Sequence, residues 1–152
     1  MLRDLIKTEA INVNLQSDDK DEVFEELTET LISLCPKLDR KEVLASFLER
    51  EKKMTTGIVT GIAIPHAISD KITEPLCAIG ISRNVIDYDA LDGKPVHIIF
   101  MILFPAGDAA LHLNIMQRLA CVFSDSTFYK SVIDKESASQ VAQAIFDIDE
   151  SI

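Results

Sequence analysis

Apolar residues recur at helical spacing in two stretches of the first third of the chain. Residues 17–34 predict a helix, because Ser-Asp-Asp at 17–19 offers an N-cap and an acidic first turn, and Pro36 follows its end. Residues 39–53 predict a second helix, with cations in its last turn where they complement the helix dipole. The inward positions are Val23, Phe24, Leu27, Leu31 and Leu34 in the first helix and Val43, Leu44, Phe47 and Leu48 in the second.

Strand-like apolar runs occupy the middle of the chain. We predict strands at residues 58–64, 76–83 and 96–104, preceded by a short strand at 10–14. The run 96–104 is apolar on both faces, so it must be covered on both. Between the last two runs, the Asp-Gly pair at 92–93 and the proline at 95 predict a turn.

The last third of the chain is again helical in pattern. One helix is predicted to begin after Asp108 as N-cap and to run to about Phe123, and two more follow at 126–133 and 137–147. Helices thus surround a strand-rich middle without strict strand–helix alternation. The pattern predicts an α+β fold: one three-layer α/β/α domain over residues 1–152, with a mixed central β-sheet flanked by helices.

Charge narrows the classes of partner. With 25 acidic and 15 basic residues, the formal net charge is -10, which repels phosphate backbones and argues against nucleic-acid binding. Residues 52–69, 93–107 and 109–124 nevertheless contain no carboxylate. A phosphoryl-handling site would favour such local relief from negative charge, but buried strands and helix faces exclude carboxylates as well, so both readings stay open.

Membrane insertion and a disulfide framework are both disfavoured. The longest apolar stretch, residues 98–106, is far shorter than the ~18 residues that a membrane helix needs. The first residues, Met-Leu-Arg-Asp, open no secretory leader, so a cytoplasmic location is expected. The cysteines at 35, 77 and 121 are odd in number and form no CxxC pair, which predicts reduced thiols within the core.

The tripeptide Ile64-Pro65-His66 is the most informative local feature. It ends a glycine-punctuated apolar run, so we expect an imidazole at a rigid element edge that a partner can reach. With a reference pKa near ~6.5, such a ring is largely neutral and nucleophilic at neutral pH. On spacing alone, a simple turn residue is the alternative. His97, within an apolar strand, is interpreted as a satisfied sheet histidine, and no HxxxH or Cys/His spacing indicates a metal site or requires a cofactor.

Five motifs, in this order and spacing, carry a family resemblance. They are Leu48-Glu49-Arg50-Glu51, Thr56-Gly57-Ile58, Gly61-Ile62-Ala63-Ile64-Pro65-His66-Ala67, Ala90-Leu91-Asp92-Gly93-Lys94-Pro95-Val96 and His112-Leu113. Together they span nearly the whole chain. The sequence resembles the enzyme IIA domain of the mannitol and fructose type, from the bacterial sugar phosphotransferase system; nitrogen-regulatory enzyme IIA proteins belong to the same family.

The resemblance implies a phosphotransferase component that works through a covalent phosphohistidine. The family's histidine takes a phosphoryl group from the histidine-containing phosphocarrier protein and passes it to a cysteine of an enzyme IIB domain. In this chain His66 occupies the position of that histidine, and Arg50 and His112 occupy those of the active-site arginine and second histidine. Chemically, a guanidinium fork and a histidine in the first turn of a helix both suit phosphate oxygens.

Two threonines and one departure complete the expected site. The hydroxyls of Thr56 and Thr60 are candidate phosphoryl-binding groups, the alternative being that they simply favour strands. The family usually reads Gly-Ile-Gly-Asn-Gly where this chain has Gly-Ile-Val-Thr-Gly at 57–61. If the missing glycine serves a positive φ or a close phosphate approach, Val59 would resist it.

Two kinds of function fit these residues. The first is a phosphoryl carrier in sugar uptake, which associates with a membrane permease complex through its enzyme IIB partner without entering the membrane. The alternative is a nitrogen-regulatory type of protein that signals by phosphorylation-dependent binding of a target.

Overall fold

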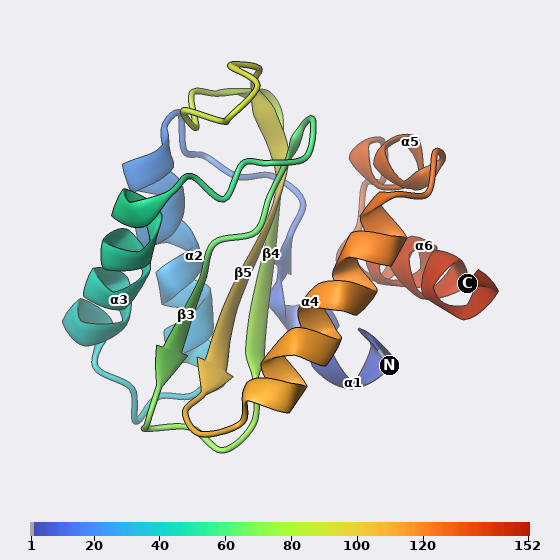
Figure 1. Ribbon diagram of the computed structural model, residues 1–152. Helices are drawn as coiled ribbons and strands as arrows, with labels where there is room; N and C mark the ends of the chain where they lie inside the picture. Colours follow the sequence, from blue (N-terminus) through green and yellow to red (C-terminus); the bar gives the residue numbers. More distant parts are fainter. Residues whose placement is uncertain (1) are drawn as a thin grey trace.

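A mixed five-stranded sheet lies between two layers of helices in the computed structural model, which describes residues 2–152 (Figure 1). The strand order is β1-β4-β5-β2, and β3 also pairs with β5. β4 and β5 are antiparallel to each other, whereas β1, β2 and β3 run parallel to their partners. The predicted α+β, three-layer α/β/α architecture with a mixed sheet is confirmed. The strands are β1 Ile11–Asn12, β2 Ile62–Ala63, β3 His66–Ser69, β4 Leu76–Ile86 and β5 Val96–Pro105.

Each face of the sheet is covered by its own set of helices. α2 (Lys20–Leu34) and α3 (Arg40–Lys53) lie on one face, seen on the left of Figure 1. The other face is covered by α1 (Leu2–Leu5), α4 (Ala109–Phe123), α5 (Phe128–Ile133) and α6 (Ala138–Ser151). Alternate residues of β5 therefore enter two separate hydrophobic cores, as expected for a strand that is apolar on both faces.

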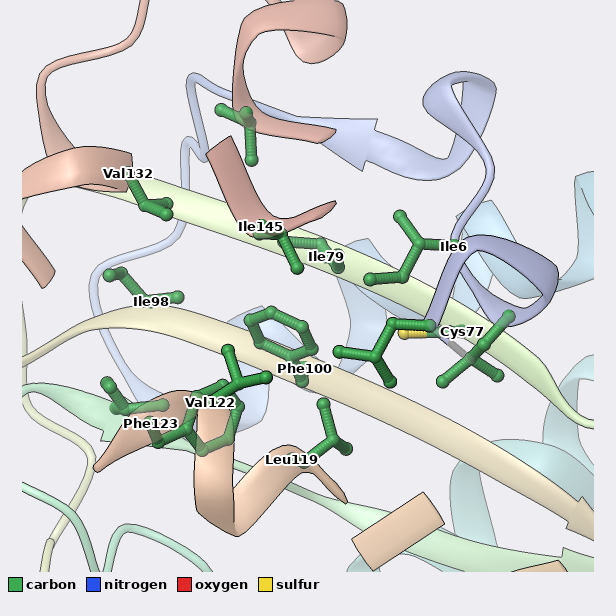
Figure 2. Close-up of a cluster of buried hydrophobic side chains, with 14 of the residues drawn as sticks. Ile6, Cys77, Ile79, Ile98, Phe100, Leu119, Val122, Phe123, Val132 and Ile145 are labelled. Atoms are coloured by element: carbon green, nitrogen blue, oxygen red, sulfur yellow. The ribbon is translucent and has the colours of Figure 1, made fainter. Parts of the chain in front are cut away.

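The core on the α4 side is centred on Phe100 (Figure 2). Its ring is fully buried and lies 5.0 Å from the ring of Phe123, measured between centroids. Leu119 and Val122 from α4 and Ile145 from α6 surround it. This core holds α4 against the sheet and so fixes where the first turn of α4 lies.

β2 and β3 together form one interrupted strand at the sheet edge. Ile62 pairs with Ile98 and His66 pairs with Ile102, so both segments keep the same offset along β5. Pro65 lies in the interruption, where a proline is tolerated because it has no N–H to donate, and its carbonyl still accepts from the Ile102 N–H at 2.9 Å. His66 is therefore the first residue of a strand.

Most predicted elements are confirmed, but the strand predicted at 58–64 is wrong in extent. Only residues 62–63 are in β2, because Gly61 adopts a positive φ of 79° that an extended strand does not allow. β3, α1 and the short 3-10 helix η1 (Thr8–Ala10) have no counterpart among the predictions. The predicted caps Asp19 and Asp108 each accept a hydrogen bond from a backbone N–H of the following helix, and Asp39 and Ser137 do the same. The helix predicted at 126–133 begins only at Phe128, after Thr127, whose side chain makes no cap hydrogen bond.

The cysteines agree only partly with the expectation of reduced core thiols. All three are free. Cys77 is buried in the sheet and Cys35 is half-buried, but Cys121 is exposed on α4, so the prediction of a core position was wrong for it. Cys121 occupies a helix position that faces away from the sheet, whereas the neighbouring Val122 faces the core.

Candidate active site

His66 presents one defined ring nitrogen. Its Nδ1 lies 2.8 Å from the carbonyl oxygen of Ile64. Because a carbonyl can only accept a hydrogen bond, Nδ1 carries the proton and Nε2 keeps the lone pair. The side chain is half-buried, so the ring is reachable at the sheet edge. A backbone group thus selects the tautomer that leaves Nε2 as a nucleophile.

His112 lies beside His66 and is itself held by an aromatic ring. The two imidazoles have centroids 5.5 Å apart at an interplanar angle of 75°. Phe104 stacks on His112 with centroids 4.1 Å apart and planes 14° apart. His112 is in the first turn of α4, which Asp108 caps through the Leu111 N–H at 3.0 Å. The prediction that this histidine opens a capped helix is confirmed.

Arg50 approaches from the opposite layer. It is in the last turn of α3, is half-buried, and donates from Nη1 to the Met54 carbonyl at 3.0 Å. Its positive charge lies near enough to His66 to lower the pKa of that ring. The guanidinium and the second imidazole therefore come from helices on different faces of the sheet and meet at the edge strand that carries His66.

The surroundings keep His66 uncharged. Burial lowers the pKa of His66, and the nearby Arg50 and His112 lower it further; the hydrogen bond to Ile64 and the negative Glu51 act in the opposite direction. The net pKa is below the reference value, so the ring stays neutral over a wider range of pH than an exposed histidine.

This lowered pKa predicts a pH dependence of stability. An unfolded His66 binds its proton near pH ~6.5, whereas the folded protein binds it only at lower pH. Between those two values the unfolded state holds more protons, so the His66 contribution to stability is lost as pH falls through this window. An NMR titration of the His66 ring should give a midpoint below ~6.5. A midpoint at or above that of a free imidazole would contradict the prediction.

Thr56 does not present its hydroxyl as predicted. The residue is buried, and its Oγ1 donates to Glu51 Oε1 at 2.7 Å and lies 2.8 Å from the Tyr88 hydroxyl. Its role is structural in this arrangement, because the hydroxyl is already used by a buried carboxylate. The backbone of Thr56 is closer to the chemistry, since its carbonyl accepts from the Ile64 N–H at 3.1 Å.

Thr60 is exposed and belongs to the loop that precedes β2. Its hydroxyl donates to Asp92 Oδ2 at 3.1 Å. Asp92 also accepts from the Lys94 N–H at 3.0 Å, a bond within the turn that the sequence predicts at residues 92–95. These bonds, with the backbone bond to Lys94 first, lower the pKa of Asp92.

Val59 is not strained at its position. Within residues 2–152 the only non-glycine residue with a positive φ is Asp89, so Val59 has a backbone that any residue adopts. The positive φ in this loop is at Gly61, which the chain retains. A Cβ at Gly61 would lie 2.7 Å from the ring of Tyr129, so a side chain there would force that ring to shift and would also strain the backbone.

Two residues near the site were not selected from the sequence. Phe104 appeared only as the end of an apolar strand, although an aromatic residue just before the helix of His112 was a usable signal. Glu51 was noted only as part of a motif and no role was predicted for it, because a Glu-Arg-Glu run usually lies on a solvated surface. The structure instead buries its carboxylate, to 5% exposure, against Lys20 Nζ at 3.1 Å. His97 is confirmed as a satisfied sheet histidine, with Nδ1 3.1 Å from the Ser82 carbonyl.

Neither a membrane-crossing helix nor a metal cluster accompanies the site within residues 2–152. None of the helices there has the length and apolar character needed to cross a membrane. That part of the chain also contains no group of three or more His, Cys, Asp or Glu side chains arranged to hold a metal ion.

Curated proteins of two kinds are similar to this chain. The fructose-specific EIIABC component of the phosphotransferase system of Bacillus subtilis is 33% identical over 145 residues, which are 95% of this chain and 23% of that protein. The chain therefore spans about a quarter of the length of that relative. The nitrogen regulatory protein of Bradyrhizobium diazoefficiens is 33% identical over 147 residues, which are 97% of this chain and 93% of that protein.

Solved structures share the fold, and a family model matches the sequence. Nitrogen regulatory protein IIA-Ntr from Neisseria meningitidis has a TM-score of 0.87 at 29% identity, over 93% of this chain and 97% of that one. Enzyme IIAMTL from Escherichia coli, in complex with phosphorylated enzyme IIBMTL, has a TM-score of 0.78 at 15% identity, over 93% and 97%. The family model described as phosphoenolpyruvate-dependent sugar phosphotransferase system, EIIA 2, matches residues 4–148. The chain belongs to this enzyme IIA family.

Proposed function

We propose that the chain is a phosphohistidine carrier of the phosphoenolpyruvate-dependent phosphotransferase system, with His66 Nε2 as the accepting atom. The observation that carries this proposal is the 2.8 Å contact of Nδ1 with the Ile64 carbonyl, which leaves a neutral, half-buried Nε2 as the free nitrogen. The donor is the histidine-containing phosphocarrier protein and the acceptor is a cysteine of an enzyme IIB domain.

The proposed transfer requires no cofactor, because the phosphoryl group moves directly between protein side chains. The lone pair of Nε2 attacks phosphorus while the P–N bond to the donor's histidine breaks, and that histidine keeps the electron pair of the broken bond. In the second step the P–N bond to His66 breaks as a P–S bond forms to the acceptor thiolate. Nδ1 keeps its proton and its hydrogen bond to the Ile64 carbonyl throughout, so the ring does not rotate between the two steps.

Positive and hydrogen-bonding groups stabilise the phosphoryl oxygens in this scheme. Arg50 supplies a guanidinium from α3, and His112 supplies a ring N–H from the first turn of α4. Phe104 keeps the His112 plane fixed by stacking on it. Thr60 would join them only by exchanging its Asp92 acceptor for a phosphoryl oxygen, and Thr56 is not part of the site.

Exposed apolar side chains near these groups suit docking of partner proteins. Ile68, two residues after His66 on β3, is 56% exposed, and Leu113, next to His112, is 57% exposed. An enzyme IIB partner is supported by the structural likeness to enzyme IIAMTL, which was solved with phosphorylated enzyme IIBMTL. The protein would act in the cytoplasm and reach a membrane permease complex only through that partner.

A phosphorylation assay tests the proposal. Incubation with phosphoenolpyruvate, enzyme I and the phosphocarrier protein should add one phosphoryl group that is labile to acid and stable to base. An unchanged mass would reject the carrier function. Subsequent addition of a fructose-type enzyme IIB domain should move the group to its cysteine.

A nitrogen-regulatory role is the second candidate. It is favoured by the backbone likeness to IIA-Ntr, with a TM-score of 0.87, and by a regulatory relative that matches along nearly its whole length. A protein of this kind would accept the phosphoryl group on His66 but pass it to no enzyme IIB cysteine, and would instead bind a target protein in only one phosphorylation state.

The departure from the usual glycine and asparagine yields a prediction about rate. The double substitution Val59→Gly with Thr60→Asn should leave the rate of phosphoryl acceptance within about twofold of the wild type, because neither side chain is strained or buried against the reacting ring. Rapid-quench measurement of phosphoprotein formation provides the comparison. A double variant that accepts the group several-fold faster would show that the departure is costly.

A further inference from the structure

Glu51 is a buried acid that holds the loop after α3. Its Oε2 accepts from the Thr56 N–H at 2.8 Å and its Oε1 accepts from Thr56 Oγ1 at 2.7 Å. Lys20 Nζ lies 3.1 Å from Oε2, and the Tyr88 hydroxyl completes the cluster at 2.8 Å from Thr56 Oγ1. One carboxylate therefore holds both the backbone and the side chain of a single loop residue.

A chain of hydrogen bonds leads from this carboxylate to the imidazole. The Thr56 carbonyl accepts from the Ile64 N–H at 3.1 Å, and the Ile64 carbonyl accepts from His66 Nδ1 at 2.8 Å. The same loop contains Met54, whose carbonyl accepts from Arg50 at 3.0 Å. The loop at 54–56 thus orients the guanidinium and also supports the backbone that fixes the imidazole.

We propose that Glu51 is a positioning residue for phosphoryl transfer. By its two hydrogen bonds to Thr56, it holds His66 and Arg50 in one fixed arrangement. The inference rests on the proposed function, in that it takes His66 as the phosphoryl acceptor. Charge alone would act in the opposite direction, because a carboxylate near the site repels a phosphoryl group. The ion pair with Lys20 offsets this repulsion, while the hydrogen bonds from Thr56 to the carboxylate are kept.

The variant Glu51→Gln tests the proposal. It keeps the size of the side chain, but it weakens the hydrogen bonds to Thr56 and loses the ion pair with Lys20. For phosphoryl acceptance from the phosphocarrier protein, kcat should fall about tenfold or more while KM changes less than about twofold. In ¹⁵N spectra of the unphosphorylated protein, the wild-type His66 should be the single Nδ1–H tautomer. The variant should show a mixture of tautomers.

Asp149→Asn provides a matched control. Asp149 is also a buried carboxylate, 2% exposed, that accepts a backbone N–H, from Leu2 at 3.0 Å, and pairs with Arg118. It lies on α6 and has no bond to the loop at 54–56. Its variant should retain the wild-type kcat and the single tautomer even where its stability falls.

Three results would separate the possibilities. Wild-type or faster transfer in Glu51→Gln, with a single His66 tautomer, would overturn the proposal and leave Glu51 a role in stability alone. If Glu51→Gln does not fold, Thr56→Val replaces it, because this variant removes the hydroxyl that donates to Glu51. A wild-type kcat and a single His66 tautomer in Thr56→Val would equally overturn the proposal. If the wild type accepts no phosphoryl group, the proposed function fails, whereas the tautomer comparison still decides whether Glu51 positions the ring.

Discussion

Replacement of His66 by alanine is expected to abolish phosphorylation of the chain by phosphoenolpyruvate, enzyme I and the phosphocarrier protein. The reason is the removal of Nε2, the free nitrogen of a ring whose Nδ1 is held by the Ile64 carbonyl at 2.8 Å. Residue 66 would then have no side-chain nitrogen to form the P–N bond. Intact-mass spectrometry before and after incubation, with acid treatment to release the group, measures the effect.

His97→Ala is the control for this experiment. His97 is also a half-buried strand histidine whose Nδ1 faces a backbone carbonyl, that of Ser82 at 3.1 Å, but it lies outside the cluster of Arg50 and His112. This variant should gain one phosphoryl group like the wild type. A phosphoryl group on the His66→Ala protein would place the accepting atom elsewhere and would contradict the site.

The largest loss of stability is expected from Phe100→Ala. The ring is fully buried between the sheet and α4, and its centroid lies 5.0 Å from that of Phe123 and 6.4 Å from that of Phe128. Removal of such a ring leaves a cavity and lowers the free energy of unfolding by about 3–5 kcal/mol. Urea unfolding should show a lower midpoint with an unchanged slope.

Leu113→Ala serves as the comparison within α4. Its side chain is 57% exposed, so its truncation should change the free energy of unfolding by less than about 0.5 kcal/mol. If Phe100→Ala instead costs below about 1 kcal/mol, the neighbouring side chains must collapse into the space, and the core would be less rigid than its packing indicates.

The parts of the fold that follow from local rules could be predicted from the sequence. Asp19 and Asp108 each cap the helix that they precede, because an N-cap depends on a few neighbouring residues. The covering of β5 on both faces also followed, because its residues are apolar without alternation. β3 could not be predicted, since residues 66–69 are extended only through their pairing with residues distant in the sequence.

In the candidate site, too, some features could be predicted from the sequence and others depend on the tertiary structure. His66 was singled out by the tripeptide that ends an apolar run, whereas Arg50 was selected only through the family resemblance. That His66, Arg50 and His112 meet depends on two cores that hold α3 and α4 on opposite faces of the sheet. The sequence could not show that the Thr56 hydroxyl is used by Glu51, because the two residues approach through a loop that reverses after α3. Burial of an acid within a charged run is a tertiary property.

The origin of Arg50 and His112 on different faces of the sheet has a consequence for how the protein could lose function. Fraying at the end of α3 would withdraw the guanidinium and spare the pair of imidazoles, whereas detachment of α4 would carry away His112 and leave the guanidinium in place. Partial opening would therefore abolish the proposed phosphoryl transfer in two distinguishable ways. On the proposed function, only a molecule with both helical layers closed on the sheet would be competent for transfer.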